Sequence, residues 1–434
     1  MVFSKALHLK TERAFVFFLV LVFPAAAQAV EIHPKAGVSF DYFGETYHVT
    51  DERDTVTTIN DYGATLGVVV TREPPSALKL RAEGDVYYGH ESARGRLLLE
   101  GEYREGPNSF LIDQDAIVRV FHEGGDYSLS SDSFQDSARL SWEHRFNEAT
   151  ALRLMHQFEA VVYSDPDQYN LNAFVQRPGV SVRQRFGFSS EVRGGYQLGW
   201  RDVPDSSELD SMRHTGDVEC TVFLDQVSVE FSDRVERRIY DQPSTRVSSW
   251  ENRSDGTVDW LRPGKIAARF QHELETVEYD EPDDLDFNFT RLRVAAGPLL
   301  RTDKGFDVSL SPLYGMLYSK TAPAENYHDW AIELGLEIRF GRTWISLTDE
   351  VGRRDYDQEA SATIVDFVTT QATASEPEGL YSDSSYNHLT ALVSADVGRS
   401  IALHLFVNWE PEDHRLNRYD SDSRIVSGSV EYRF

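Results

Sequence analysis

Alternation of apolar and polar residues, repeated in segments of about ten residues, is the feature that most constrains the fold of this chain. Within residues 77–88, the apolar residues Leu78, Leu80 and Val86 have even numbers, whereas the charged residues Arg81 and Glu83 have odd numbers. We call this even or odd position along a strand its parity. Successive side chains of a β-strand point to opposite faces, so the segment has one apolar and one charged face. A helical period of 3.6 residues would spread the same charges around the whole helix. We therefore interpret this segment as a strand with two unlike surroundings.

The same alternation recurs along almost the whole chain and predicts about 18–20 strands, with twenty as the best count. The predicted strands lie at 36–43, 62–71, 77–88, 95–104, 110–120, 137–146, 150–162, 171–184, 190–201, 214–224, 227–239, 250–260, 265–277, 287–299, 306–318, 329–340, 343–353, 386–397, 400–409 and 425–434. The alternation is weakest at 110–120, 171–184 and 287–299. Asp349 falls on the apolar parity of its segment, which suggests a β-bulge there.

Composition and connection lengths select one fold class for these strands. The net charge of −28 excludes a general nucleic-acid binder, which needs a basic surface. The chain contains no run of 18 apolar residues, the length that a membrane-spanning helix needs. A strand in a barrel meets lipid with only every second residue, so a barrel does not need such a run. We predict an all-β fold: a single antiparallel, up-and-down transmembrane β-barrel over residues 30–434. Short turns are expected at the periplasmic rim and long acidic loops, including 51–54, at the extracellular rim.

The first 29 residues are typical of a secretory signal peptide. Lys5, Lys10 and Arg13 precede an apolar segment at 14–23, and Ala27-Gln28-Ala29 forms an A-x-A cleavage site. The apolar segment is too short to cross a bilayer as a helix. We expect an exported protein located in the bacterial outer membrane.

The single cysteine, Cys220, excludes an internal disulfide and any metal site built from cysteines. Cys220 lies on the same face of its predicted strand as Val218 and Val222, so we expect it to face lipid. His144, His156 and His272 fall on the apolar parity of their segments as well. We predict no cofactor and no metal site, although oxygen-rich acidic loops such as 202–210 and 280–286 could hold Ca²⁺ or Mg²⁺.

Charged residues of both signs occupy the strand positions whose side chains are expected to point into the barrel. A barrel of about twenty strands is too wide for its side chains to fill. The predicted lumen-lining residues are Arg81, Glu83, Asp85, Arg96, Glu100, Arg139, Glu143, Arg145, Arg193, Arg269, Glu273, Glu333 and Arg339. Two interpretations remain open: a polar wall that orients solute, or mutual ion pairs that stiffen the wall.

The segment 354–385 is the longest predicted loop. It is a candidate for a constriction that folds into the lumen, and the alternative is a hairpin that stands above the membrane. Aromatic residues near the strand ends, among them Trp250, Trp260, Trp330, Phe340 and Trp344, are expected to form two interfacial girdles.

His388, Ser394 and His404 share the inward parity near the C-terminus and raise the alternative of a barrel hydrolase. Catalysis needs a nucleophile, a base and an orienting group within hydrogen-bond reach, and the spacing of these residues does not require that arrangement. No catalytic motif is present, so we predict that the protein is not an enzyme.

The chain ends with Val430, Glu431, Tyr432, Arg433 and Phe434, an alternating strand with a terminal phenylalanine. This ending resembles the signal by which Gram-negative outer-membrane β-barrels are recognised for insertion. The resemblance implies the barrel-assembly machinery, through Phe434, and outer-membrane lipid as partners. Size and the lack of accessory domains are similar to porin-like barrels found among exopolysaccharide-export genes. The expected function is passive passage of small polar solutes or of a polysaccharide, with a purely structural surface barrel as a further alternative.

Overall fold

The structure is a computed structural model. Twenty strands make up almost all of the residues that it describes. The described residues are 30–50, 53–72, 77–122, 132–166, 170–187, 189–241, 246–260, 266–283, 286–302, 305–358, 383–398, 400–414 and 420–434. The strands are β1 (Val30–Thr50), β2 (Arg53–Arg72), β3 (Leu78–Gly89), β4 (Ser92–Glu105), β5 (Asn108–Phe121), β6 (Ser133–Arg145), β7 (Thr150–Tyr163), β8 (Ala173–Phe186), β9 (Ser190–Asp202), β10 (Ser211–Leu224), β11 (Val227–Tyr240), β12 (Ser249–Trp260), β13 (Ile266–Tyr279), β14 (Phe289–Arg301), β15 (Phe306–Tyr318), β16 (Tyr327–Phe340), β17 (Thr343–Tyr356), β18 (Ser384–Val397), β19 (Ile401–His414) and β20 (Ser421–Arg433). Two single 3₁₀ turns, η2 (Ser207–Leu209) and η3 (Pro323–Glu325), lie in loops. Among the described residues, no helix is long and apolar enough to cross a membrane.

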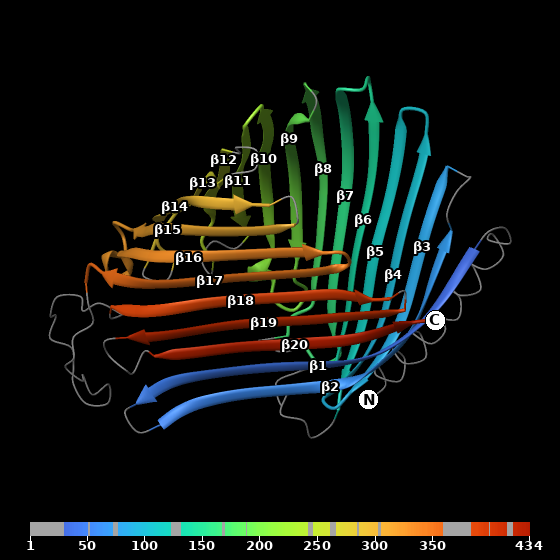
Figure 1. The fold of residues 1–434 in the computed structure, drawn as a ribbon, viewed down its shortest axis with the longest axis horizontal. Helices are drawn as coiled ribbons and strands as arrows, with labels where there is room; N and C mark the ends of the chain where they lie inside the picture. The colour runs from blue at the N-terminus through green and yellow to red at the C-terminus, as the bar shows by residue number, and fades with distance from the viewer. Residues whose placement is uncertain are drawn as a thin grey trace.

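The sheet closes on itself. Each strand pairs antiparallel with its neighbours in the sequence, and β1 pairs with β20 from Lys35↔Arg433 to Tyr47↔Ser421. In Figure 1 the strands β15–β20, β1 and β2 run across β4–β8 at a steep angle, as two opposite walls of a barrel with tilted strands do. The prediction of a closed antiparallel barrel is confirmed.

The two faces of the sheet are distinguished by how far side chains reach along it. Arg293 on β14 forms an ion pair with Glu350 on β17, three strands away. Such a contact requires the concave face, so the charged parity is the inner wall. The opposite parity carries large exposed apolar side chains, for example Leu66 at 68% and Phe340 at 80% exposure. The charged face is therefore the lumen and the apolar face is the outside.

Tight turns at one rim explain where the backbone takes left-handed conformations. Positive φ angles occur at Gly106, Gly187, Gly305, Gly341 and Gly398, and at the non-glycine residue Asp225 with φ of 43°. All six lie in the short connections between even-numbered strands and the strands that follow them. Glycine has no Cβ to clash in this region and suits such turns.

The predicted strands are all found, but the predicted alternation of loop lengths is wrong at two places. The β1–β2 hairpin extends far beyond the expected 36–43 and 62–71, with backbone pairs from Val30↔Arg72 to His48↔Asp54. Only residues 51–52 lie between these strands, so Arg53 and Asp54 belong to β2 rather than to a loop. The β-branched run 55–59 favours an extended strand. His90 and Glu91 alone separate β3 from β4.

The suggested β-bulge at Asp349 is also wrong. The β16–β17 register runs without interruption from Tyr327↔Tyr356 to Phe340↔Thr343. Asp349 therefore faces outward, directly opposite Leu334 and Leu389. Its Oδ1 is shielded from solvent and has no hydrogen-bond partner among the described residues. The parity of the segment was correct, and the acid is tolerated on an otherwise apolar face.

The predicted signal peptide, residues 1–29, lies outside the described residues, as does most of the segment 354–385. That segment begins inside β17, which ends at Tyr356, and its description resumes at Asp383.

Candidate functional site: the charged lumen wall

The backbone register places every predicted lumen-lining residue on the inner face, and most of them form ion pairs there. Arg81 contacts Glu83 at 2.7 Å and Glu100 at 3.5 Å. Arg96 makes a bidentate pair with Asp115 at 2.8 and 2.7 Å. The contacts of the remaining predicted residues differ between the walls of the barrel, and whether any of them meets a solute stays a prediction.

The junction of β1 with β3 and β20 is built around one cation, Lys35. Its ammonium contacts Glu83, lies 3.4 Å from Asp85 and 3.9 Å from Glu431, and its side chain is only 9% exposed. Lys35 reaches β3 across Gly67 on β2, where a Cβ atom would lie 2.7 Å from the Lys35 Cε. Glycine at this position opens the path for the side chain, so one cation is held among three acids.

A second buried network lies on β14–β18. The Tyr386 hydroxyl lies 2.6 Å from an Asp329 oxygen and 3.0 Å from Glu350, which also pairs with Arg293. The Tyr386 ring covers Gly352, where a Cβ would overlap it. Tyr386 is 4% exposed, so this network is part of the wall itself.

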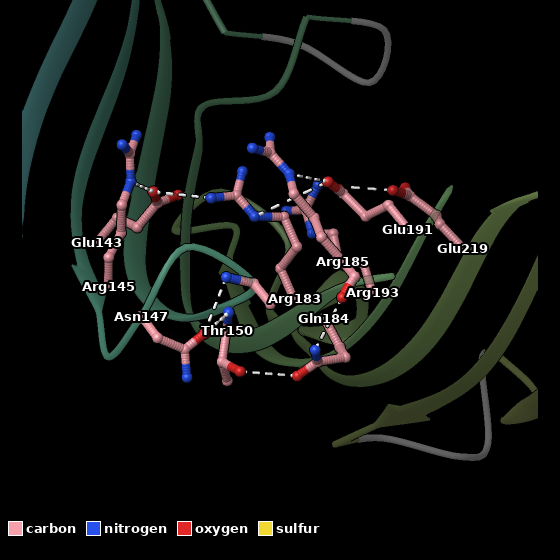
Figure 2. Close-up of polar contacts among 11 residues, drawn as sticks. Glu143, Arg145, Asn147, Thr150, Arg183, Gln184, Arg185, Glu191, Arg193 and Glu219 are labelled. Carbon is pink, nitrogen blue, oxygen red and sulfur yellow. Dashed lines mark hydrogen bonds and ion pairs between the residues drawn. The ribbon is translucent and has the colours of Figure 1, made fainter. Parts of the chain in front are cut away.

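Arginine is in excess on the wall formed by β6–β9. Glu143 is shared by Arg145 and Arg183, each at 3.1 Å. Glu191 is likewise shared by Arg183 at 3.9 Å and Arg185 at 3.0 Å. Figure 2 shows these side chains in one row along the sheet, continued by the pair of Arg193 and Glu219 at 3.5 Å. Glu143 and Glu191 therefore each pair with two arginines, whereas Glu219 pairs with one.

Some arginines on this wall have no acid partner in the part of the chain that the structure describes. Arg139 and Arg201 form no ion pair with any described residue, and Arg153 donates only to the Ser141 hydroxyl at 3.1 Å. The inner face of β6–β9 carries eight arginines against the three glutamates Glu143, Glu159 and Glu191. The arginines are Arg139, Arg145, Arg153, Arg177, Arg183, Arg185, Arg193 and Arg201.

The wall formed by β16–β20 has the opposite sign. Among its inner-face side chains that the structure describes, the cations are Arg339 and Arg354. The acids are Asp329, Glu333, Glu337, Glu350, Asp396, Glu410, Glu412 and Glu431. These strands lie about half the ring of twenty away from β6–β9, so a cationic wall faces an anionic wall across the lumen.

The other predicted residues lie between these extremes and are paired. Arg269 forms a bidentate pair with Asp259 at 2.7 and 2.8 Å. Glu273 contacts Arg253 at 3.1 Å and Arg291 at 3.2 Å.

The aromatic girdles are present at both ends of the outer face, with one correction. Trp250, Trp330 and Phe340 are exposed on that face. Trp344 instead lies opposite Arg339 on the inner wall, where its indole N–H donates to Glu337 at 2.9 Å.

The residues of the hydrolase alternative are not assembled into a catalytic site. Ser394 and His404 are 3.1 Å apart. His388 stacks on Tyr386 instead, with ring centroids 4.7 Å apart, and lies six residues along β18 from Ser394, about 20 Å in a strand. Among the described residues, no carboxylate hydrogen-bonds to His404.

In the described parts of the acidic loops, carboxylates bind backbone N–H groups. Asp210 accepts from Val203 at 2.7 Å, and Asp205 accepts from Asn172 at 3.0 Å. Within the described ranges, no group of three or more His, Cys, Asp or Glu side chains is placed to hold a metal ion.

Reasoning from the sequence missed the groups that organise the wall. Lys35, Arg183, Glu350 and Tyr386 have the inward parity, but their partners lie on other strands. A glycine opposite a long inward side chain, such as Gly67 or Gly352, was the signal that could have found two of them.

Comparisons with known proteins do not assign this chain to a family. No family model matches the sequence, and no curated protein matches it. Similar solved structures include Pseudomonas aeruginosa OpdL, at 11% identity, TM-score 0.45, and coverage of 93% of this chain and 99% of that chain. P. aeruginosa OpdK with vanillate, at 10% identity and TM-score 0.45, has the same two coverages. The ferric citrate transporter FecA in the unliganded form, at 10% identity and TM-score 0.45, matches over 93% of this chain and 79% of that chain.

The class of the protein rests on its own geometry rather than on these distant similarities. A closed antiparallel barrel with a charged inner wall, an apolar outer wall and aromatic girdles is a transmembrane β-barrel of the bacterial outer-membrane type. The resemblance inferred from the C-terminal strand is thus confirmed at the level of the barrel class.

Proposed function

We propose that the protein is a passive outer-membrane channel for small polar solutes, and that it favours solutes with separated positive and negative charges. The observation that carries this proposal is the opposition of a cationic wall on β6–β9 to an anionic wall on β16–β20. Barrels of 16–18 strands already leave an aqueous channel, and this barrel has twenty strands.

Opposed charges create a field across the lumen, and low-dielectric walls strengthen it. A dipolar solute lowers its energy by turning its anionic group towards β6–β9 and its cationic group towards β16–β20. Arg139, Arg153 and Arg201 form no ion pair with any carboxylate in the described part of the wall, so we expect them to be available to an anionic group. Conduction requires binding that is weak and repeated, and several arginines in succession meet that requirement.

The test is flux through the purified barrel. In planar bilayers we expect stepwise ionic conductance, and in liposomes we expect a zwitterion to enter several-fold faster than an uncharged solute of equal size. Folded protein that gives neither conductance nor solute entry contradicts a channel. Equal entry of the two solutes contradicts the role of the opposed walls.

No contact among the described residues favours the polysaccharide-export alternative, which stays a prediction. A long neutral glucan that blocks the ionic current would support it.

The assembly signal at the C-terminus also stays a proposal. It is supported by the exposure of Phe434, at 68%, beside Tyr432 on the outer face. Phe434→Ala should slow insertion into the outer membrane, and an unchanged insertion rate counts against it.

A further inference from the structure

The outer face of β12 differs from the rest of the lipid-facing surface. Between the girdle residues Trp250 and Trp260 it presents Asn252, Ser254, Gly256 and only one larger apolar residue, Val258. The outer face of β16 presents Ile332, Leu334, Leu336 and Ile338 over the corresponding length. Hydrocarbon offers no partner to polar groups, so β12 is poorly suited to face lipid.

A carboxylate and an imidazole flank β12 on its two neighbouring strands. Asp233 on β11 lies directly opposite Ser254. On the other side, the Ser254 hydroxyl lies 3.4 Å from His272 Nε2 on β13, and the imidazole covers Gly256. The Asp233 carboxylate forms no hydrogen bond or ion pair with any described residue. An acid without a partner on a lipid-facing wall is costly unless another group covers it.

Asp233 and His272 lie at the same depth. Asp233 is six residues from Val227, where β11 begins, and His272 is six residues from Ile266, where β13 begins. Both strands start at the short-turn rim, so both side chains lie near the middle of the wall. Only β12 lies between their strands, so the two side chains are two strand spacings apart, about 10 Å.

We propose that this face binds a second copy of the chain and that the protein is a two-fold symmetric dimer in the membrane. A two-fold axis along the membrane normal through β12 keeps depth and reverses lateral order. Asp233 of one copy then faces His272 of the other, twice, while Ser254 lies at the axis. The small side chains of β12 allow the two walls to approach closely. The contact removes two acids and two imidazoles from lipid and pairs them.

The position of Asp349 shows why the other acid in the middle of the outer wall does not suggest the same contact. It lies opposite Leu334 and Leu389, with no basic side chain at its depth on either neighbouring strand. A two-fold contact through β17 would place acid against acid. Charge complementarity therefore selects the β11–β13 face.

Cross-linking tests the position of the axis. In the full chain with Cys220→Ser, reconstituted in lipid, Ser254→Cys should form an inter-chain disulfide on mild oxidation. Leu334→Cys, at the same depth on the distant β16 and more exposed than Ser254 (39% against 9%), is the control and should stay monomeric. A Ser254→Cys variant that does not cross-link, or a Leu334→Cys variant that cross-links equally, overturns the proposal.

Native mass spectrometry from lipid nanodiscs tests the charge pairing. The wild type should be a dimer, and Asp233→Leu should raise its dissociation constant at least tenfold. The exchange of Asp233→His with His272→Asp should restore the dimer, whereas Asp349→Leu should have no effect. Heat-dependent gel mobility confirms that each variant is folded, and Asp233→Asn replaces any that is not. A monomeric wild type, or equal weakening by Asp349→Leu, overturns the dimer.

Discussion

The junction around Lys35 and the wall of β6–β9 both place charged side chains in the lumen, yet they use them differently. At the junction, one cation is enclosed by Glu83, Asp85 and Glu431 and is 9% exposed. On the wall, Arg139 and Arg153 have no acid within ion-pair distance among the described residues. Inward charges are therefore of two kinds: those that are paired at the closing junction, and those without an ion pair, which the proposed function assigns to solute.

The largest expected effect is on stability, from Lys35→Met. Removal of the cation leaves three carboxylates together on a buried part of the wall, which should cost about 3 kcal/mol in the free energy of unfolding. Chemical denaturation followed by tryptophan fluorescence in lipid vesicles measures it. The double variant Lys35→Met with Asp85→Asn should recover part of the loss, because it removes one unpaired charge.

Lys79→Met is the matched control for the junction. Lys79 also lies on the inner face, but its side chain is 59% exposed and 4.0 Å from Glu102. Its substitution should change the free energy of unfolding by less than about 0.5 kcal/mol. Equal losses in the two variants would remove the distinction between closing charges and free charges.

A somewhat smaller loss is expected from Gly352→Ala. The added methyl group overlaps the Tyr386 ring, which must move away from Asp329 and Glu350. We expect a cost of about 1–3 kcal/mol, as for overpacking of a close contact. Gly84→Ala is the control, because a Cβ there meets no atom within 4 Å. Denaturation of both variants under one set of conditions decides the matter, and a stable Gly352→Ala protein would show that the network can shift freely.

On the arginine wall, the expected change is in selectivity rather than in stability. Arg139→Gln combined with Arg153→Gln removes two cations that form no ion pair with a described carboxylate. The cation-to-anion permeability ratio, measured from the reversal potential, should rise about three- to tenfold, equivalent to at most about 1.4 kcal/mol. The free energy of unfolding should stay within about 0.5 kcal/mol per site. The reverse outcome, a destabilised barrel with unchanged selectivity, would mean that these arginines stabilise the wall and do not interact with permeating ions.

The sequence could predict the strands and their faces because a barrel imposes a period of two on every segment. Even Asp349 lies on the face that its parity indicated, and only the inferred bulge was wrong. Pairing between inward charges could not be predicted, because register and curvature decide it: Arg293 meets Glu350 from three strands away. The length of the β1–β2 hairpin was missed because polar threonines and acids hid its extended run. The polar outer face of β12 became visible only once Asp233, Ser254 and His272 were aligned across three strands.

The smallest expected effect concerns a charge pair outside the lumen, at the outer end of β11. Arg237 donates to both oxygens of Asp280, at 2.7 and 2.6 Å, and its guanidinium lies 5.3 Å from the centre of the Trp250 ring. These hydrogen bonds hold the pKa of Asp280 below its ordinary value. The folded state therefore gains stability from this pair at pH values above the ordinary aspartate pKa of about 3.9, and loses it as the pH falls through the lowered value. For so exposed a pair the gain is about 0.5 kcal/mol or less. The difference in unfolding free energy between the wild type and Asp280→Asn should be constant from pH 7 to about 4 and should vanish below that. A difference that persists in acid would show that the shape of the side chain at this rim, rather than its charge, fixes Arg237 over Trp250.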